Sequence, residues 1–124
     1  MATNRKILTK KTENVSSFID NYHSDVINEV EESITNNRVV VVGMAYNPHV
    51  SKVNKVLGEN GVQFKYLEYG SYFSMWSQRL SIKMFTGFPT YPQVFVDGAL
   101  IGGCDDTIKE LNEGTLFNGL KKNK

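Results

Sequence analysis

Cysteine and histidine, the side chains that most often act as nucleophiles or hold transition metals, are rare in this chain. The one cysteine is Cys104, and the two histidines are His23 and His49. One thiol cannot form an intramolecular disulfide, and with two distant histidines it makes no local zinc motif. We therefore expect no metal site, and the only thiol chemistry open to the chain is that of Cys104.

Cys104 stands between Gly102-Gly103 and Asp105-Asp106, a pattern typical of a strand that ends where a helix begins. The free N–H groups at a helix N-terminus bind carboxylates and lower the pKa of a thiol, whereas adjacent aspartates oppose a thiolate. The same glycines and aspartates can equally serve only to end the strand and cap the helix. Both interpretations stay open, with His49 as either a base for Cys104 or a surface residue.

The first half of the chain has the periodicity of a helical region followed by a β-α-β unit. Apolar residues at steps of three and four over residues 14–36 predict one long amphipathic helix or two short ones, with Asn14 as the N-cap. Four consecutive valines at 39–42 predict a central strand that is buried on both faces. A helix over 50–57 and an alternating strand over 62–69 follow, and such a crossover makes the two strands parallel.

The second half of the chain predicts a helix, a hairpin and further helices. Residues 72–85 are loosely helical, and the Asp97-Gly98 pair between two apolar runs predicts a tight hairpin turn. A helix follows over 105–111 and a short last one over 116–120. We interpret the aromatic residues of 69–76 as core rather than as the wall of a groove. This order predicts an α/β thioredoxin fold, a four-stranded mixed sheet flanked by helices, with an N-terminal helical extension.

Composition bounds the class of protein. A chain of 124 residues with 40% hydrophobic and 22% charged residues indicates one compact domain, which we place at 13–120 with its core at 24–120, between a disordered tail at 1–12 and a frayed end at 121–124. The formal net charge of +1 argues against a nucleic-acid partner. The apolar runs are too short to span a membrane or serve as a secretory signal, so we predict a cytoplasmic protein without a membrane partner.

Three stretches, taken together, resemble the glutaredoxin family. Residues 87–98, GFPTYPQVFVDG, resemble the segment around that family's cis-proline, and residues 101–106, IGGCDD, resemble its Gly-Gly-x-Asp segment beside the glutathione site. Residues 46–52, YNPHVSK, stand where glutaredoxins carry their redox motif. The resemblance covers residues 24–120 and is closest to the monothiol branch, because 88–93 have that branch's aromatic-Pro-Thr-x-Pro-Gln form.

The resemblance places Asn47 at the position of the redox cysteine and Val50 at that of the second cysteine of dithiol members. Neither side chain can form a mixed disulfide or hold an iron–sulfur cluster. Val50 also shares a helical face with Val53 and Leu57, which indicates a packing residue. We therefore predict a glutaredoxin-like protein without thiol catalysis and without a cluster, which works as a binding or adaptor module for a protein partner.

The same resemblance implies a glutathione site that is partly kept. The backbone of Tyr91, next to Pro92, would pair with the cysteine moiety of glutathione. The helix start at Gly103, Cys104 and Asp105 would hold the γ-glutamyl carboxylate, as a helix N-terminus can.

The cations that the family uses for the glycine carboxylate of glutathione are missing. Their positions fall at Met44 and at Phe88 or Pro89. Each missing charge-assisted hydrogen bond weakens binding, so we expect weak glutathione binding unless Lys52 or Lys83 compensates.

Two alternatives follow from the same residues. In the first, glutathione itself supplies the thiol of an oxidoreductase or transferase, and Tyr46 or Asn47 positions it. In the second, Cys104 provides the chemistry, either as a nucleophile or by holding an iron–sulfur cluster between two chains.

Overall fold

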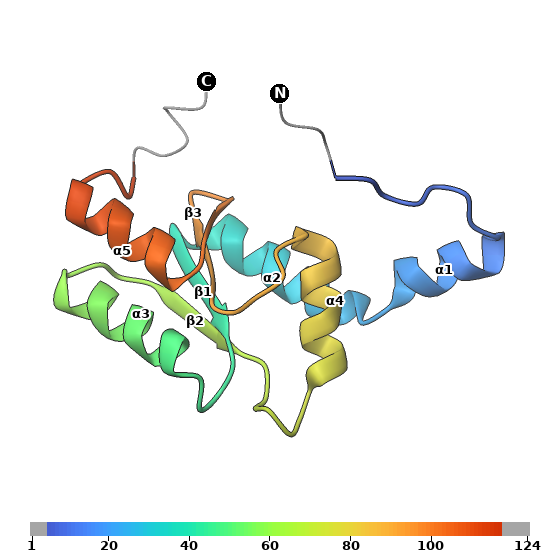
Figure 1. Cartoon of the computed structure of the whole chain (residues 1–124), viewed down its shortest axis with the longest axis horizontal. Coiled ribbons are helices and arrows are strands. Elements are labelled where there is room, and N and C mark those ends of the chain that lie inside the picture. The colour runs from blue at the N-terminus through green and yellow to red at the C-terminus, as the bar shows by residue number, and fades with distance from the viewer. Residues whose placement is uncertain (1–4, 118–124) are drawn as a thin grey trace.

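The computed structural model describes residues 5–117 and has helices on both faces of one sheet (Figure 1). The elements are α1 (Glu13–Asn21), α2 (Ser24–Asn36), β1 (Val39–Gly43), α3 (Pro48–Glu59), β2 (Lys65–Glu68), α4 (Trp76–Thr86), β3 (Gln93–Val96), β4 (Ala99–Gly102) and α5 (Cys104–Glu113). The four strands lie in the order β2-β1-β3-β4. The predicted α/β fold with a four-stranded mixed sheet is therefore confirmed.

The four valines form the centre of the sheet. β1 is buried along its whole length, pairs in parallel with β2 and pairs antiparallel with β3. β3 returns as β4 through a turn in which Asp97 has φ 51° and Gly98 has φ 83°. Positive φ at both central residues is what a two-residue hairpin turn requires, so the Asp-Gly prediction holds.

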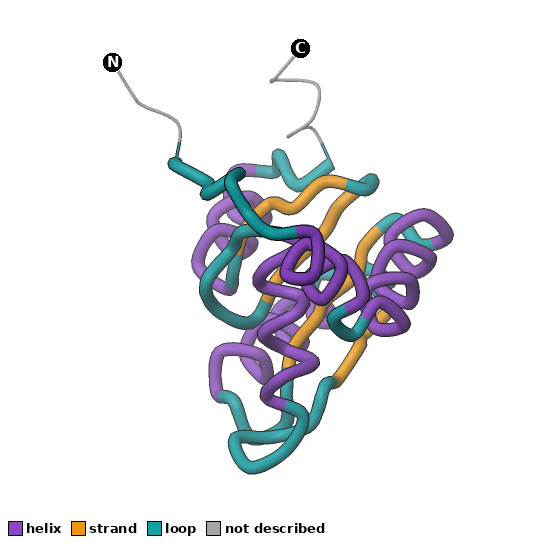
Figure 2. Tube along the Cα trace, turned by 90° about the vertical axis from the view of Figure 1, so that its right-hand side faces the viewer, coloured by secondary structure: helices purple, strands orange, loops and turns teal. Residues whose placement is uncertain are grey.

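Two cores separate the sheet from its helices. On one face α2 and α4 cover the sheet, and a cluster that includes Val30, Val40 and Ile82 is buried between them. On the other face α3 and α5 pack together, and Val53 and Leu57 are fully buried against the sheet. Figure 2 shows the strands with helices on both sides. Every second residue of a strand faces the same side of the sheet. Val40 and Val42 of β1 therefore belong to the first core, and Val39 and Val41 belong to the second.

The helical region before β1 is two helices. α1 ends before His23, which has φ 48° and precedes α2. Thr12, not Asn14, is the N-cap of α1, because its hydroxyl accepts the N–H of Val15 at 3.3 Å. Residues 5–12 are exposed and form no helix or strand, while the remainder of the tail predicted at 1–12, and the end predicted at 121–124, lie outside the described residues.

The predicted boundaries differ most from the structure at β2, at α4 and after α5. β2 is limited to Lys65–Glu68, inside the predicted strand of 62–69. α4 begins at Trp76, because residues 70–75 form a loop. Leu116 and Phe117 lie in a turn after α5, and the rest of the short helix predicted at 116–120 lies outside the described residues.

The loop before α4 also overturns the interpretation of its aromatic residues as core. Tyr69 is buried, but Tyr72, Phe73 and Trp76 are 57%, 98% and 66% exposed. The reason is a buried guanidinium: Arg79 donates to the carbonyl oxygen of Tyr69 at 2.9 Å and to that of Ser74 at 2.6 Å. The polar backbone of the loop therefore faces inward, and its rings face solvent.

Candidate functional site

The loops that carry the three family-like stretches meet at one edge of the sheet. β1 ends at Gly43, β3 begins opposite that end, and β4 ends at Gly102, opposite Val94 of β3. A cavity of about 320 Å³ opens at this edge. It is lined by His49, Phe88, Thr90, Tyr91, Pro92, Gly103, Cys104, Asp105 and Asp106. All five residues predicted to bind glutathione thus lie around one cavity.

Pro92 and its neighbours form one wall of this cavity. The Tyr91–Pro92 peptide bond is cis, and the buried side chain of Gln93 donates to the carbonyl oxygen of Phe88 at 3.0 Å. The ring of Tyr91 is buried, with its hydroxyl donating to the carbonyl oxygen of Arg79. Burial raises the pKa of the Tyr91 hydroxyl, which the positive charge of Arg79 partly opposes. Tyr91 is therefore fixed by its side chain, and a ligand in the cavity would meet chiefly its backbone.

The start of α5 forms the opposite wall. Asp106 accepts the N–H of Gly103 at 3.0 Å, and the hydroxyl of Thr107 donates to the carbonyl oxygen of Gly103 at 2.8 Å. The N–H groups of the first helical turn, from Cys104 to Asp106, have no acceptor within the helix. The two walls are close at Gly103, where a Cβ would lie in ordinary van der Waals contact, 3.4 Å, with the carbonyl oxygen of Pro92. The cavity consequently offers a carboxylate the donors of a helix N-terminus.

The thiol of Cys104 is poorly placed for nucleophilic chemistry. Cys104 is 6% exposed. Burial raises its pKa; the positive charge of Lys52 lowers it and the carboxylate of Asp105 raises it further. Because the thiolate is the nucleophile, a raised pKa keeps Cys104 in its unreactive protonated form at neutral pH.

Asn47 is the N-cap of α3. Its side-chain Oδ1 accepts the N–H of His49 at 2.9 Å and the N–H of Val50 at 3.2 Å, and Pro48 occupies the first helical position. Two donors that would otherwise favour an anion at this helix start are thus taken by a neutral carboxamide. Val50 is 2% exposed and packs on Gly43 of β1, since a Cβ at Gly43 would lie 2.8 Å from its methyl groups.

Of the two candidate residues Tyr46 and His49, only His49 lines the cavity. Tyr46 is 85% exposed, has φ 62° and does not line the cavity. His49 does line it, from the start of α3. Phe88, Thr90 and Asp106 also line the cavity; they are not among the residues predicted to bind glutathione, although each lies within a stretch that carries the family resemblance.

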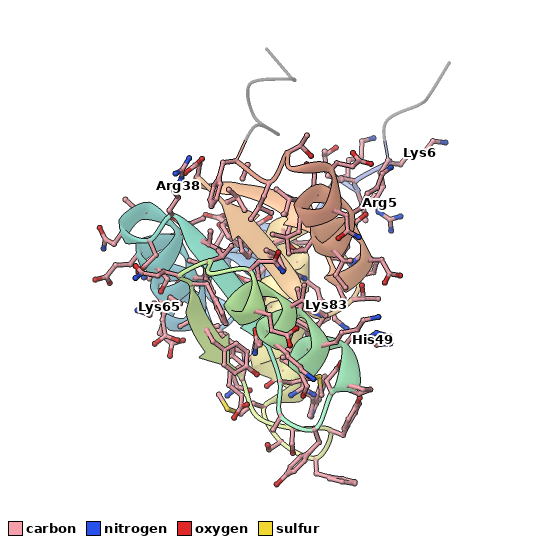
Figure 3. The ribbon with its side chains drawn as sticks, turned by 90° about the vertical axis from the view of Figure 1, so that its left-hand side faces the viewer. Arg5, Lys6, Arg38, His49, Lys65 and Lys83 are labelled. Atoms are coloured by element: carbon pink, nitrogen blue, oxygen red, sulfur yellow. The ribbon has the colours of Figure 1, made fainter. Side chains whose placement is uncertain are left out.

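Two lysines each lie near one residue that lines the cavity. The Nζ of Lys83, on α4, lies 5.5 Å from the ring centroid of Tyr91, and Lys52, on α3, is close enough to Cys104 to lower its pKa. Figure 3 labels Lys83, on α4, and His49, at the start of α3. Met44, in contrast, is 6% exposed and uncharged. The lysines near lining residues of the cavity thus stand on α3 and α4 rather than in the loop before Asn47, and neither is itself a lining residue.

Residues 5–117 show neither a metal centre nor a membrane span. No cluster of three or more histidine, cysteine, aspartate or glutamate side chains is arranged to hold a metal ion there. Nor does that part of the chain contain a helix of the length and hydropathy needed to cross a bilayer.

A mixed sheet in the order β2-β1-β3-β4, with a cis-proline at its edge, defines the chain as a thioredoxin-fold protein. It is 93% identical over 122 residues to a glutaredoxin-like protein of Dictyostelium discoideum (98% of this chain, 99% of that one), and 34% identical over 89 residues to a glutaredoxin of Vernicia fordii (72% and 86%). The chain belongs to the glutaredoxin family, although no family model matches it.

Solved structures show the same fold. A mutated buckwheat glutaredoxin superposes with a TM-score of 0.70 and 23% identity, over 83% of this chain and 94% of that one. The buckwheat glutaredoxin–glutathione complex superposes with a TM-score of 0.65 and 24% identity, over 75% and 84%.

Proposed function

We propose that this chain is a thiol-inactive glutaredoxin-like protein that binds glutathione weakly and works as a binding or adaptor module. The observation that carries the proposal is the cap of α3. The N–H groups of His49 and Val50, which would stabilise a thiolate at this helix start, are bonded to the Oδ1 of Asn47. A carboxamide cannot attack a disulfide, so the step that begins thiol–disulfide exchange has no nucleophile at this position.

The glutathione part of the proposal rests on the opposite side of the cavity. The first turn of α5 offers N–H donors to the γ-glutamyl carboxylate, and Tyr91 beside Pro92 offers its backbone to the cysteine moiety. A buckwheat relative with the same fold was solved as a glutathione complex, which supports this use of the cavity. The glycine carboxylate would depend on Lys52 and Lys83, which lie near the lining residues Cys104 and Tyr91 without lining the cavity themselves and hold their charge on flexible side chains. We infer weak binding for that reason.

An iron–sulfur cluster, the other group that the family resemblance implies, is poorly matched by the residues at this site. A cluster needs a thiolate ligand, and Cys104 is buried with a raised pKa. A glutathione thiol positioned by Tyr46 is also not favoured, because the exposed ring of Tyr46 does not line the cavity. The binding role is therefore the one that the geometry supports best.

Reduced glutathione should shift the backbone amide NMR signals of Tyr91, Cys104 and Asp105 saturably, with a dissociation constant of about 1 mM, in the range expected for one polar site of this kind. Lys83→Ala should weaken binding about three- to tenfold, because it removes one partly exposed charge. Lys65→Ala is the matched control, since Lys65 is an exposed lysine of β2, an edge strand that contributes no residue to the cavity lining.

The titration has a clear negative result. If no amide at this edge of the sheet moves at roughly 10 mM glutathione, tenfold above the expected constant, the glutathione part of the proposal is wrong. Equal weakening by Lys83→Ala and Lys65→Ala would show that net charge, and not Lys83 at the cavity, governs affinity.

A further inference from the structure

Helix α1 stands apart from the rest of the molecule. It has nine residues and buries none of them, and Figure 1 shows it projecting from the body at one end. Its apolar side chains lie on one face, with Val15 47% exposed and Phe18 68% exposed. Isolated helices shorter than about 12–15 residues are marginal in water. A packing partner outside the chain's own fold would supply the stability that α1 lacks.

A hollow beside α1 has room for such a partner. A cavity of about 260 Å³ lies between α1, α2 and α4. Its lining is mostly apolar on the α4 side, where Met84 is 48% exposed and Phe85 is 43% exposed. Asp20 lines it from α1 and Asn28 from α2. One helical turn beyond Asn28 stand Glu31 and Glu32, both exposed, so the hollow continues into an acidic surface.

Charge is separated sharply along this part of the chain. Residues 5–11 carry four basic side chains and no acidic one, whereas residues 12–37 carry six acidic side chains and neither lysine nor arginine. All ten charged side chains are exposed. The one ion pair found within residues 5–117 joins Arg38 to Asp97 and involves none of the ten.

The basic segment is not stabilised by its own helix. Lys10 and Lys11 directly precede α1, where the positive end of the helix dipole disfavours cations.

The direction in which α1 leaves the body is fixed at the break before α2. The hydroxyl of Ser81 donates to the carbonyl oxygen of Tyr22 at 2.7 Å, and His23 Nε2 lies 3.0 Å from the hydroxyl of Ser77.

We propose that the occupant of this surface is a second copy of the chain. In a two-fold dimer, the apolar face of α1 from each copy fills the hollow beside Met84 and Phe85 of the other, and the basic segment 5–11 lies along the acidic surface of the other copy's α2. A second copy fits because it carries both complements at once, an apolar helix and a cationic segment that precedes it. This inference is independent of the glutathione site.

Sedimentation of the purified full chain tests the apolar part of the interface. The chain should have twice its 14.0 kDa mass at about 0.05 M NaCl and shift toward the monomer at about 0.5 M, where charges are more strongly screened. Phe18→Asp should raise the dimer dissociation constant at least about tenfold, because a charge would enter the hollow. The matched control is Phe73→Asp, at an exposed ring of the loop before α4, and it should leave the dimer unchanged.

A charge exchange tests the pairing itself. The Lys10→Glu/Lys11→Glu variant and the Glu31→Lys/Glu32→Lys variant should each be monomeric alone and form a mixed dimer when combined. Lys55→Glu/Lys65→Glu makes the same change in net charge as the first variant and should remain dimeric. A chain that is monomeric at low salt and high concentration overturns the proposal. A dimer that Phe18→Asp leaves intact, or two charge variants that do not rescue each other, overturns this interface.

Discussion

Replacing Asn47 by cysteine should give this chain the ability to reduce a glutathione mixed disulfide. A thiolate at position 47 would replace Oδ1 as the acceptor of the N–H groups of His49 and Val50, which lie within hydrogen-bonding distance of the present side chain. Such a position at a helix N-terminus lowers the pKa of a cysteine from about 8.5 into the range of about 3.5–7.5. Turnover at pH 7 should rise on the order of 100-fold above the wild-type background.

Asn60→Cys is the matched control for that gain. Asn60 is also an asparagine cap of α3, but it stands at the C-terminal end, where the helix dipole disfavours a thiolate. The pKa of a cysteine there should lie above that of a cysteine at position 47, and the variant should have no more activity than the wild type. Equal activity of the two variants would show that any exposed thiol suffices and that the cap of α3 has no special role.

Gly102→Ala should destabilise the fold by about 2–4 kcal/mol and abolish glutathione binding. Gly102 has φ 125°, which an alanine adopts only with strain. A Cβ there would lie 2.2 Å from Oδ2 of Asp106, the atom that accepts the N–H of Gly103. The variant would therefore carry backbone strain and also lose the cap of α5, worth about 1 kcal/mol. Urea unfolding measures the first effect, and the glutathione titration measures the second.

Gly98→Ala separates the two contributions. Gly98, in the hairpin turn, also has a positive φ of 83°, but a Cβ at this position would have no heavy atom within 4 Å. It should cost about 1–2 kcal/mol from the backbone alone and leave glutathione binding unchanged. If Gly102→Ala costs no more than Gly98→Ala, the contact between position 102 and Asp106 does not constrain the site.

Elements set by local chemistry were predictable from the sequence. The four valines of β1 and the Asp97-Gly98 turn depend on β-branched side chains and on a backbone conformation that few residues adopt, so their outcome changes little with the rest of the fold. The exposure of Tyr72 and Phe73 in the loop before α4, and of Trp76 at the start of α4, was not predictable. The conformation of the loop depends on the buried Arg79, whose two carbonyl partners no local pattern identifies.

The candidate site also contains residues whose position was predictable from the sequence and residues whose position was not. Tyr91, Pro92 and Gly103 follow or precede strands that meet at one edge of the sheet, so strand order alone brings them together. His49 and Lys83 come from α3 and α4, and their distances to the cavity depend on how those helices pack. The carboxamide of Asn47 caps α3 by accepting two backbone N–H groups, a role that its place in the sequence alone did not reveal.

Turnover of a glutathione mixed disulfide by the purified chain, measured beside its Cys104→Ser variant, shows whether this protein has any thiol catalysis. We expect both proteins to be indistinguishable from the blank, because Asn47 holds the helix start and burial keeps the Cys104 thiol protonated. Glutathione binding measured on the same samples would show that the protein is folded. Turnover by the wild type that Cys104→Ser abolishes would show that the chain is not thiol-inactive and that Cys104 is its nucleophile.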